Sequence, residues 1–269
     1  MADQLRVDEQ WRLLFEEGKT IPARKRISQL YAMMPAGSRC RVCNMPLNGL
    51  GGEVMHILGR SQSNINPHLC STCDSFFRTN PGGVEIRLSM LFADIRGSTG
   101  LAEKMAPADF KKLIDRFYAA ATEVLSRTDA VIDKLAGDQV SGYFVPGLAG
   151  PDYARVALRA AEELLHTTGY GSPDGPWITV GAGVHTGTAF IGSVGSRGGI
   201  VDVTALGDAV NVAARLASLA GAGEILASEE TLASAGSPTA GLERRELPLK
   251  GRSQPVSVYV LFANGSSGS

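Results

Sequence analysis

The stretch "SMLFADIRGST" (residues 89–99) places an acidic side chain directly after a short apolar run. The run from Met90 to Ala93 is typical of a buried strand, and Asp94 ends it just before a turn that contains Gly97. Most aspartates at strand ends are turn or cap residues. A carboxylate beside free backbone N–H groups can also bind a cation and a phosphate. The remainder of the chain decides between these two interpretations.

Strands and helices alternate along the chain from residue 84 onward. The patterns predict strands over 84–94, 177–187 and 198–208, helices over 107–128, 153–167 and 209–220, a hairpin over 130–145, and short strands up to residue 262. The order strand, helix, two strands, helix, strand predicts an α+β fold, a ferredoxin-like βαββαβ core with additions.

The predicted hairpin brings a second carboxylate, Asp138, to a strand end beside Gly137. Two carboxylates at neighbouring strand ends can share hard divalent cations such as Mg²⁺ through oxygen ligands. The turn formed by Gly97, Ser98 and Thr99 can offer backbone N–H groups to phosphate oxygens. Metal and phosphate ligands together indicate a reaction at a nucleoside triphosphate, although kinases and polymerases use the same parts.

A third feature lies on the predicted helix 209–220, where Asn211 and Arg215 are four residues apart and share one face. An arginine beside an asparagine can bind a phosphate and a ribose oxygen. The same spacing also fits a surface helix whose arginine pairs with solvent or a nearby acid.

Five ordered segments together resemble the catalytic domain of the class III nucleotidyl cyclases, from about Val84 to Phe262. They are "LFADIRGSTGLAEKM" (91–105), "VIDKLAGDQVSGYF" (131–144), "GAGVHTGTAFIGSVG" (181–195), "TALGDAVNVAARL" (204–216) and "LPLKGRSQPVSVYVL" (247–261). The resemblance implies an adenylate cyclase, which converts ATP to 3′,5′-cyclic AMP and pyrophosphate. A guanylyl or dual-specificity cyclase and a catalytically silent nucleotide-binding regulator are the alternatives. A polymerase-like transferase lacks support from the Asn–Arg helix.

The resemblance also implies metal ligands and substrate contacts. Asp94 and Asp138 match the aspartates that hold two Mg²⁺ or Mn²⁺ ions, with the main-chain carbonyl of Ile95 as a further ligand. One ion would activate the ribose 3′-hydroxyl for attack on the α-phosphate, and the other would bind the β- and γ-phosphates. The matching substrate residues are Lys134 and Thr204 for the base, Asn211 and Arg215 for the ribose and the transition state, and Lys250 for the terminal phosphates.

One position departs from the common family pattern, because many members have aspartate where this chain has Thr204. A carboxylate only accepts a hydrogen bond from the adenine amino group, whereas a threonine hydroxyl accepts or donates. Discrimination of ATP from GTP is therefore expected to be weaker than average. The Lys134–Thr204 pair still resembles the adenylyl branch, and threonine here also resembles the subgroup that responds to bicarbonate.

The resemblance further implies a homodimer with two composite active sites. In this family one catalytic domain contributes the metal aspartates, and the other contributes the base-selecting residues and the Asn–Arg pair. This chain has one such domain and carries both sets, so two identical chains would form two equivalent sites.

Ahead of the cyclase-like region, "CRVC" (40–43) and "CSTC" (70–73) form two pairs with 26 residues between them. Four thiolates from Cys40, Cys43, Cys70 and Cys73 suit Zn²⁺. An iron–sulfur cluster or unliganded cysteines are the alternatives. His56 and His68 lie between the pairs and fit ordinary polar loop residues better than ligands, and His185 in "GVHTG" fits a structural role.

The chain divides on these patterns into a helical segment (1–35), a four-cysteine module (36–80), the cyclase-like domain (81–263) and a disordered tail or cloning remnant (264–269). Helical patterns surround Trp11 in the first segment and Ile27 to Tyr31 further on. Residues 36–80 lose periodicity and have too few apolar residues for a core of their own, so we expect something other than burial to hold them.

Composition sets limits on partners and location. A net charge of −1 gives no electrostatic argument for nucleic acid or an acidic membrane as partner. No apolar run approaches the roughly 20 residues that span a bilayer, and the N-terminus is too polar for a secretion signal. These features predict a cytoplasmic protein, where thiols stay reduced and bind metal more often than they form disulfides.

Overall fold

The computed structural model describes residues 2–18, 30, 31, 33–195, 200–249, 252 and 254–263. Two parts of the sequence-based expectation lie outside them, namely Lys250 and the tail 264–269. The second N-terminal helical pattern is described only from Leu30, and Leu30, Tyr31 and Met33 are helical.

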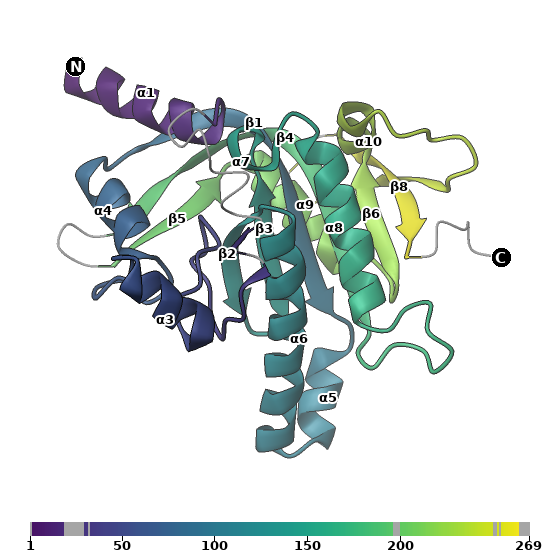
Figure 1. The fold of residues 1–269 in the computed structure, drawn as a ribbon. Coiled ribbons are helices and arrows are strands. Elements are labelled where there is room, and N and C mark those ends of the chain that lie inside the picture. The colour runs from purple at the N-terminus through teal and green to yellow at the C-terminus, as the bar shows by residue number, and fades with distance from the viewer. Residues whose placement is uncertain are drawn as a thin grey trace.

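Within the described residues, eight strands form one mixed sheet (Figure 1). The strands are β1 (Gly83–Ile95), β2 (Val131–Ala136), β3 (Gln139–Phe144), β4 (Val180–Gly195), β5 (Val201–Leu206), β6 (Glu224–Ser228), β7 (Arg244–Leu247) and β8 (Val256–Phe262). Their order is β2-β3-β1-β4-β6-β8-β7, and β5 pairs with β4 outside this path. The predicted α+β core is confirmed, with β7 and β8 among its additions.

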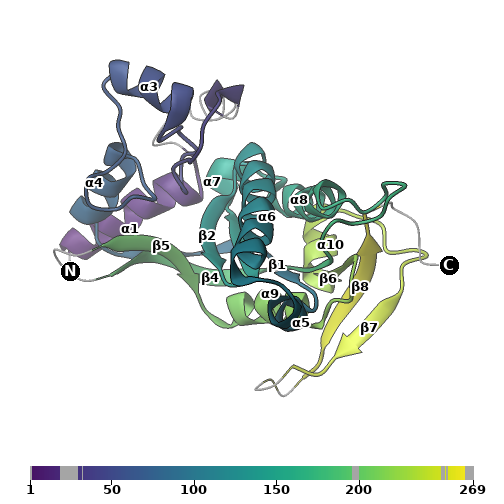
Figure 2. The same cartoon turned by 90° about the horizontal axis from the view of Figure 1, so that it is seen from below.

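Helices cover both faces of the sheet (Figure 2). On one face lie α6 (Pro107–Arg127), α8 (Tyr153–Thr167) and α10 (Glu229–Ala235), and on the other lies α9 (Asp208–Leu219). The short helices α5 (Ser98–Lys104) and α7 (Pro146–Ala149) follow β1 and β3. The predicted helices over 107–128, 153–167 and 209–220 are confirmed as α6, α8 and α9.

The central strand β1 has buried side chains on both faces, and this fixes where Asp94 lies. Leu88, Met90 and Phe92 pack into the apolar cluster that includes the inner face of α9. Leu91 and the other odd-numbered apolar residues pack against α6 and α8. Because successive side chains alternate, Asp94 lies on the Phe92 face, which is the face of α9.

Strand β4 is longer than the sequence predicts, and its glycines allow α9 to pack closely against it. We expected a strand over 177–187, whereas β4 runs from Val180 to Gly195. Pairing with β1 and then with β5 extends it through glycine-rich sequence, where intrinsic strand propensity is low. A Cβ on Gly183 would lie 2.2 Å from the Ala217 nitrogen of α9, so α9 rests directly on the sheet.

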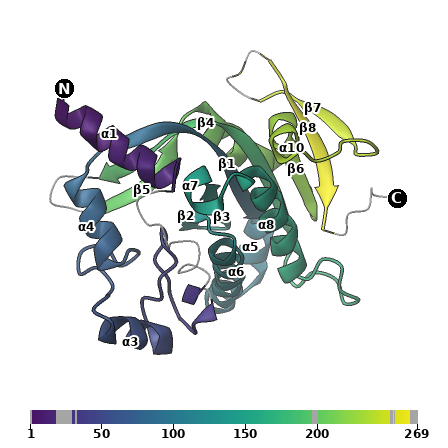
Figure 3. The same ribbon diagram turned by 45° about the horizontal axis from the view of Figure 1, so that its top comes forward.

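The N-terminal part packs on the far end of the same sheet (Figure 3). Helix α1 (Ala2–Phe15) lies along β1, and α4 (Ser71–Thr79) lies beside β5. The expected loss of periodicity over 36–80 is wrong, because this stretch contains α4 and α3 (Gly49–Ile57). Cys70 is the N-cap of α4, and its sulfur accepts a hydrogen bond from the Cys73 N–H, a cap that apolar periodicity does not reveal.

Burial also holds this segment, contrary to the expectation from composition. Phe77, Met45 and Leu69 are buried with Trp11 and Phe15 in the cluster that contains the β1 core residues. The segment therefore shares a core with the sheet instead of forming its own. The boundaries at residues 35 and 80 stay a prediction.

Candidate active site

The first part of the candidate site is a pair of carboxylates that we call the acidic edge, Asp94 and Asp138. Asp94 is next to last in β1, and Asp138 lies in the turn between β2 and β3. Strands β1 and β3 pair with Asp94 opposite Gln139, and the Ile95 N–H donates to the Asp138 carbonyl over 3.0 Å. Strand register thus brings the two aspartates to one sheet end, as the sequence predicts.

Asp94 sits in an environment that disfavours its charge. Its Oδ2 lies 2.7 Å from the Arg96 guanidinium, while its Oδ1 is buried and has no hydrogen-bond partner among the described residues. Burial raises the pKa of Asp94, Arg96 opposes that shift, and the nearby Asp138 adds to it. A buried carboxylate oxygen without a partner is costly, and a divalent cation would satisfy it. The acidic edge therefore fits a metal ion.

The turns around the acidic edge are fixed by local contacts. The Ser98 hydroxyl donates to Asp138 Oδ2, and the Tyr118 hydroxyl donates to the Gly137 carbonyl over 2.8 Å. Gly97 has φ +70°, in the left-handed region that glycine adopts readily, so β1 turns at once into α5. The first N–H groups of α5, from Ser98 and Thr99 onward, have no intrahelical partner and suit an anion.

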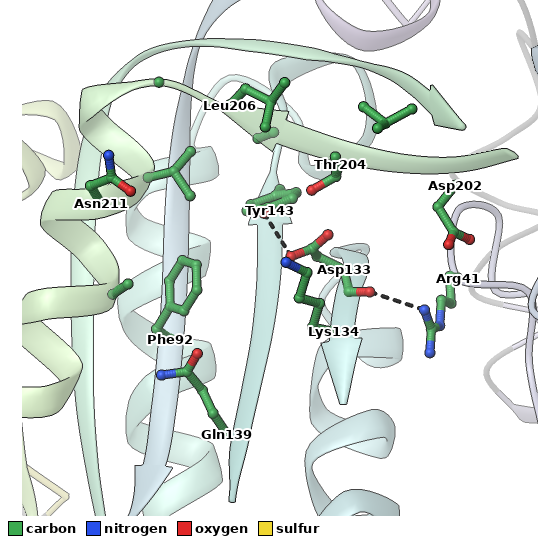
Figure 4. Close-up of a pocket in the computed structure, with 15 residues that line it drawn as sticks. Arg41, Phe92, Asp133, Lys134, Gln139, Tyr143, Asp202, Thr204, Leu206 and Asn211 are labelled. Atoms are coloured by element: carbon green, nitrogen blue, oxygen red, sulfur yellow. Dashed lines mark hydrogen bonds between the residues drawn. The ribbon is translucent and has the colours of Figure 1, made fainter. Parts of the chain in front are cut away.

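The second part of the candidate site is a cavity of about 620 Å³ that we call the central pocket. Residues of β2, β3, β5 and α9 line it, and Lys134, Thr204 and Asn211 are among them (Figure 4). The structure thus brings together three of the predicted substrate residues, although they lie up to 77 positions apart in the sequence.

A buried polar network supports the wall of the pocket at Lys134. The carboxylate of Asp133 accepts hydrogen bonds from Tyr143 (2.8 Å) and Ser141 (3.1 Å). The pairing of β2 with β3 shifts register between Ile132 and Lys134, a bulge of the kind that re-aims side chains. Asp133, which is buried, and its neighbour Lys134, which is exposed, therefore both line the pocket.

The Asn–Arg pair lies on α9 as predicted, but only one member lines the central pocket. Asn211 is exposed and lines it. Arg215 is half-buried one turn further along and is not among the lining residues. Lys250 is outside the described residues, so its role stays a prediction.

The acidic edge and the central pocket are neighbours but remain separate. The pocket reaches Phe92 and Gln139, which stand two residues before Asp94 and one after Asp138. Neither aspartate lines it. In this chain, the predicted metal ligands and the predicted base contacts therefore do not enclose one common cavity.

The four cysteines converge on one point in the N-terminal part. Their sulfurs all lie within 4.8 Å of one another, and Cys43 Sγ is 3.6 Å from Cys70 Sγ. That distance is far too long for a disulfide and close to the roughly 3.8 Å edge of a tetrahedral ZnS₄ site with 2.3 Å bonds. This cysteine cluster could hold one metal ion. His56 and His68 are exposed and are not part of it.

Sequence reasoning missed several residues that shape the site. Arg96 pairs with Asp94, and its position two residues further on was a usable signal. Asp133 lines the central pocket beside Lys134, at a bulge that the sequence does not mark. Arg41 lines the central pocket from between two cysteines, and no local pattern links it to a strand 90 residues away.

Fold and acidic edge together define a class of protein, the nucleotidyl cyclase catalytic domain of class III. Residues 85–263 match the family described as the adenylate and guanylate cyclase catalytic domain. This match covers more than half of the chain, and the chain belongs to that family.

Curated relatives are about a third identical to this chain over the aligned region. An adenylate cyclase of Anabaena cylindrica is 30% identical over 188 residues, which cover 66% of this chain and 37% of the relative. An adenylate cyclase of Mycobacterium tuberculosis is 32% identical over 177 residues, covering 64% and 39%. The chain thus spans little more than a third of the length of these relatives.

Solved structures of both specificities resemble this fold. The guanylyl cyclase Cya2 aligns with a TM-score of 0.59 at 25% identity, covering 66% of this chain and 93% of that one. The adenylyl cyclase CyaB from P. aeruginosa aligns with a TM-score of 0.55 at 27% identity, covering 65% and 93%. Among the described residues, no helix combines the length and the apolar character needed to cross a bilayer.

Proposed function

We propose that this protein is an adenylate cyclase that converts ATP to 3′,5′-cyclic AMP and pyrophosphate. The observation that carries the proposal is the acidic edge, where a buried Asp94 oxygen has no partner among the described residues and the carboxylate of Asp138 is close enough to raise the pKa of Asp94. The relatives from Anabaena cylindrica and Mycobacterium tuberculosis, at 30% and 32% identity, are adenylate cyclases. Lys134 and Thr204, both in the central pocket, support adenine as the base.

Asp94, Asp138 and the carbonyl of Ile95 would hold two Mg²⁺ or Mn²⁺ ions. When bound, such ions lower the pKa of the ribose 3′-hydroxyl and neutralise charge on the triphosphate. Arg96 and Ser98 hold the two carboxylates in place for this role. The N–H groups from Gly97 to Thr99 would bind phosphate oxygens.

The remaining residues would position the nucleotide and stabilise the transition state. Asn211 would orient the ribose so that its 3′-oxygen faces the α-phosphorus, while Lys134 and Thr204 bind the base. As the bond to the 3′-oxygen forms and pyrophosphate departs, Arg215 would meet the charge that develops on the α-phosphoryl oxygens. Lys250 would bind the terminal phosphates.

A homodimer would complete each site. Neither Asp94 nor Asp138 lines the central pocket, so the acidic edge of one chain opposite the pocket of a second would join the two parts. Two-fold symmetry would then give two equivalent sites, which is the commonest arrangement in homo-oligomers.

For the cysteine cluster we propose a single Zn²⁺ ion. A polynuclear iron–sulfur cluster separates its thiolates with several bridged irons, whereas these sulfurs lie within 4.8 Å of one another. Elemental analysis of the purified protein should find one zinc per chain. A brown protein with visible absorption would favour iron instead.

A product assay tests the proposed activity directly. The purified chain is incubated with Mn²⁺ or Mg²⁺ and either ATP or GTP, and the product is identified by mass spectrometry. Cyclic AMP as the main product supports the proposal. Cyclic GMP formed from GTP in an amount equal to or greater than the cyclic AMP formed from ATP would establish the guanylyl or dual-specificity alternative. The guanylyl cyclase Cya2 is a structural precedent for it.

Absence of any cyclic product would instead favour a silent nucleotide-binding regulator. Thr204 also motivates a response to bicarbonate. Activity with and without added bicarbonate at fixed pH and ionic strength tests that response, and an unchanged rate would dismiss it.

A further inference from the structure

The N-terminal part reaches into the central pocket through one side chain. Arg41 stands between Cys40 and Cys43, and its guanidinium lines the pocket at the end away from Asn211, close to Asp202 (Figure 4). A residue of the cysteine-bearing segment therefore lies on the same cavity as Lys134 and Thr204.

Main-chain contacts tie Arg41 both to the other cysteine loop and to the sheet. Its N–H donates to the His68 carbonyl over 3.0 Å, and its carbonyl accepts from the Ile132 N–H over 2.8 Å. Its Nη1 donates to the carbonyl of Asp133 over 3.0 Å. The position of the guanidinium thus depends on both cysteine loops and on β2.

The second cysteine loop, which leads to Cys70, contacts the opposite wall of the pocket. Asn66 is fully buried, and its side-chain amide donates to the Val201 carbonyl (2.8 Å) and to Asp202 Oδ1 (3.0 Å). The amide oxygen accepts from the His68 N–H over 2.9 Å. Since Thr204 follows two residues after Asp202 on β5, the first cysteine loop contacts β2 and the second contacts β5 at this end of the pocket.

We infer that Arg41 is a nucleotide-binding residue of the central pocket and that a metal ion on the four cysteines holds it there. This inference rests on the proposed nucleotide site. A guanidinium carries five N–H donors, and the Asp133 carbonyl takes one of them. The pocket end where Lys134 and Thr204 would bind the base suits further donors, which can bind ring nitrogens of adenine or O6 and N7 of guanine.

Nucleotide binding by the full-length chain tests the role of Arg41. We would measure the Kd of 3′-deoxy-ATP by calorimetry with Mg²⁺, because this analogue lacks the attacking hydroxyl and stays intact. In Arg41→Met the Kd should rise about 10-fold, the effect of losing one charge-assisted hydrogen bond. The KM for ATP should rise in parallel, with a smaller change in kcat.

Arg60→Met is the matched control, since Arg60 belongs to the same segment but bonds to the Tyr31 hydroxyl outside the pocket. Its Kd should stay within about twofold of the parent. Should Arg41→Met fail to fold by circular dichroism, Arg41→Gln retains a donor for Asp133 and takes its place. A Kd for the Arg41 variant equal to that of the Arg60 variant overturns the inference.

A second comparison tests the link to the metal. The metal is removed from parent and Arg41→Met with a chelator under reducing conditions, the loss is checked by elemental analysis, and the Kd is measured again in Mg²⁺ buffer. Depletion should weaken binding by the parent about as much as the substitution does, and should weaken Arg41→Met little further. An equal additional loss in both proteins shows that the metal does not act through Arg41.

These readouts also separate this inference from the proposed function. A parent chain that binds the analogue but makes no cyclic product contradicts the enzyme activity and leaves the Arg41 test intact. A parent chain that makes cyclic AMP, with unchanged binding in Arg41→Met, contradicts only the present inference.

Discussion

The acidic edge and the central pocket are built in different ways. The two aspartates of the acidic edge are positioned by the register of adjacent strands and by turns that directly follow them. The central pocket instead collects side chains from residue 41 to residue 214, on strands β1 to β5, helix α9 and a cysteine loop. The acidic edge depends on one strand pairing and the adjoining turns, whereas the central pocket exists only after the whole domain has folded.

The difference also bears on how the protein would work. The acidic edge carries two carboxylates and a buried oxygen without a partner among the described residues, while the central pocket carries Lys134 and Arg41 together with Asp133 and Asp202. In the proposed site the first part would hold the metal ions and the second would bind the base. Substitutions can therefore test the two parts separately.

Replacement of either aspartate of the acidic edge should abolish turnover. In Asp94→Ala or Asp138→Ala the metal ligands are lost, and we expect the rate of cyclic AMP formation to fall at least about 10³-fold. Binding of 3′-deoxy-ATP through the central pocket should survive in part. Turnover near the parent rate would show that the acidic edge does not hold the catalytic ions.

Arg215→Ala should lower kcat by about 10²–10³-fold without unfolding the protein, because Arg215 would act on charge that develops in the transition state. Stopped-time assays and thermal unfolding measure the two properties. Mixing this variant with Asp94→Ala should restore roughly a quarter of the parent activity, since half of randomly mixed dimers contain one intact site. No recovery, despite mixed dimers detected by mass, would contradict the composite site.

Thr204→Asp should sharpen base selection while leaving the acidic edge untouched. A carboxylate accepts from the adenine amino group and repels guanine O6, so the ratio of kcat/KM for ATP over GTP should rise about 10-fold. Thr99→Asp is unsuitable as a control because Thr99 belongs to the turn proposed to bind phosphate, whereas the exposed Thr79→Asp is suitable. An unchanged ratio would place Thr204 away from the base.

The pH dependence of stability is a separate effect, because it concerns the fold beneath both parts and not catalysis. Burial lowers the pKa of His185 to about 4, and its Nδ1 lies 2.8 Å from the Ser228 hydroxyl. In the unfolded chain His185 binds a proton near pH 6.5. Protonation therefore favours the unfolded chain, and the free energy of unfolding is highest above pH 6.5 and decreases as the pH falls toward 4.

Linkage sets the loss at roughly 3 kcal/mol. Urea unfolding of the parent at pH 7.5 and 5 should show part of it, and His185→Gln should flatten the dependence. The exposed His166→Gln should leave the dependence unchanged. A parent stability that does not vary with pH would contradict the assignment.

Much of the fold was predictable because its signals are local. The apolar run before Asp94, the stripe of α6 and the turn at Gly137 predicted β1, the helix and the hairpin close to their observed bounds. The second half of β4 was not predictable from its glycine-rich sequence, because pairing with β1 and β5 creates it. Helix α4 was missed since its start depends on a cysteine cap.

The candidate site shows the same contrast between local sequence signals and long-range contacts. Asp94 and Asp138 stood out as strand-end carboxylates, and the spacing of Asn211 and Arg215 predicted their shared helix face. Arg41 could not be found in this way, because its link to the pocket is a contact across 92 positions, with Asp133. The joint core of Trp11 and Phe77 was hidden for the same reason.

The hydrogen bond between Ile132 and Arg41 lies at one edge of the sheet. Strand β2 lies at the border of the sheet, where an open backbone invites pairing with a foreign chain. The turn at Cys40–Cys43 covers this border by taking the Ile132 N–H. Loss of the geometry of this turn would therefore leave the β2 edge open to pairing with a second chain.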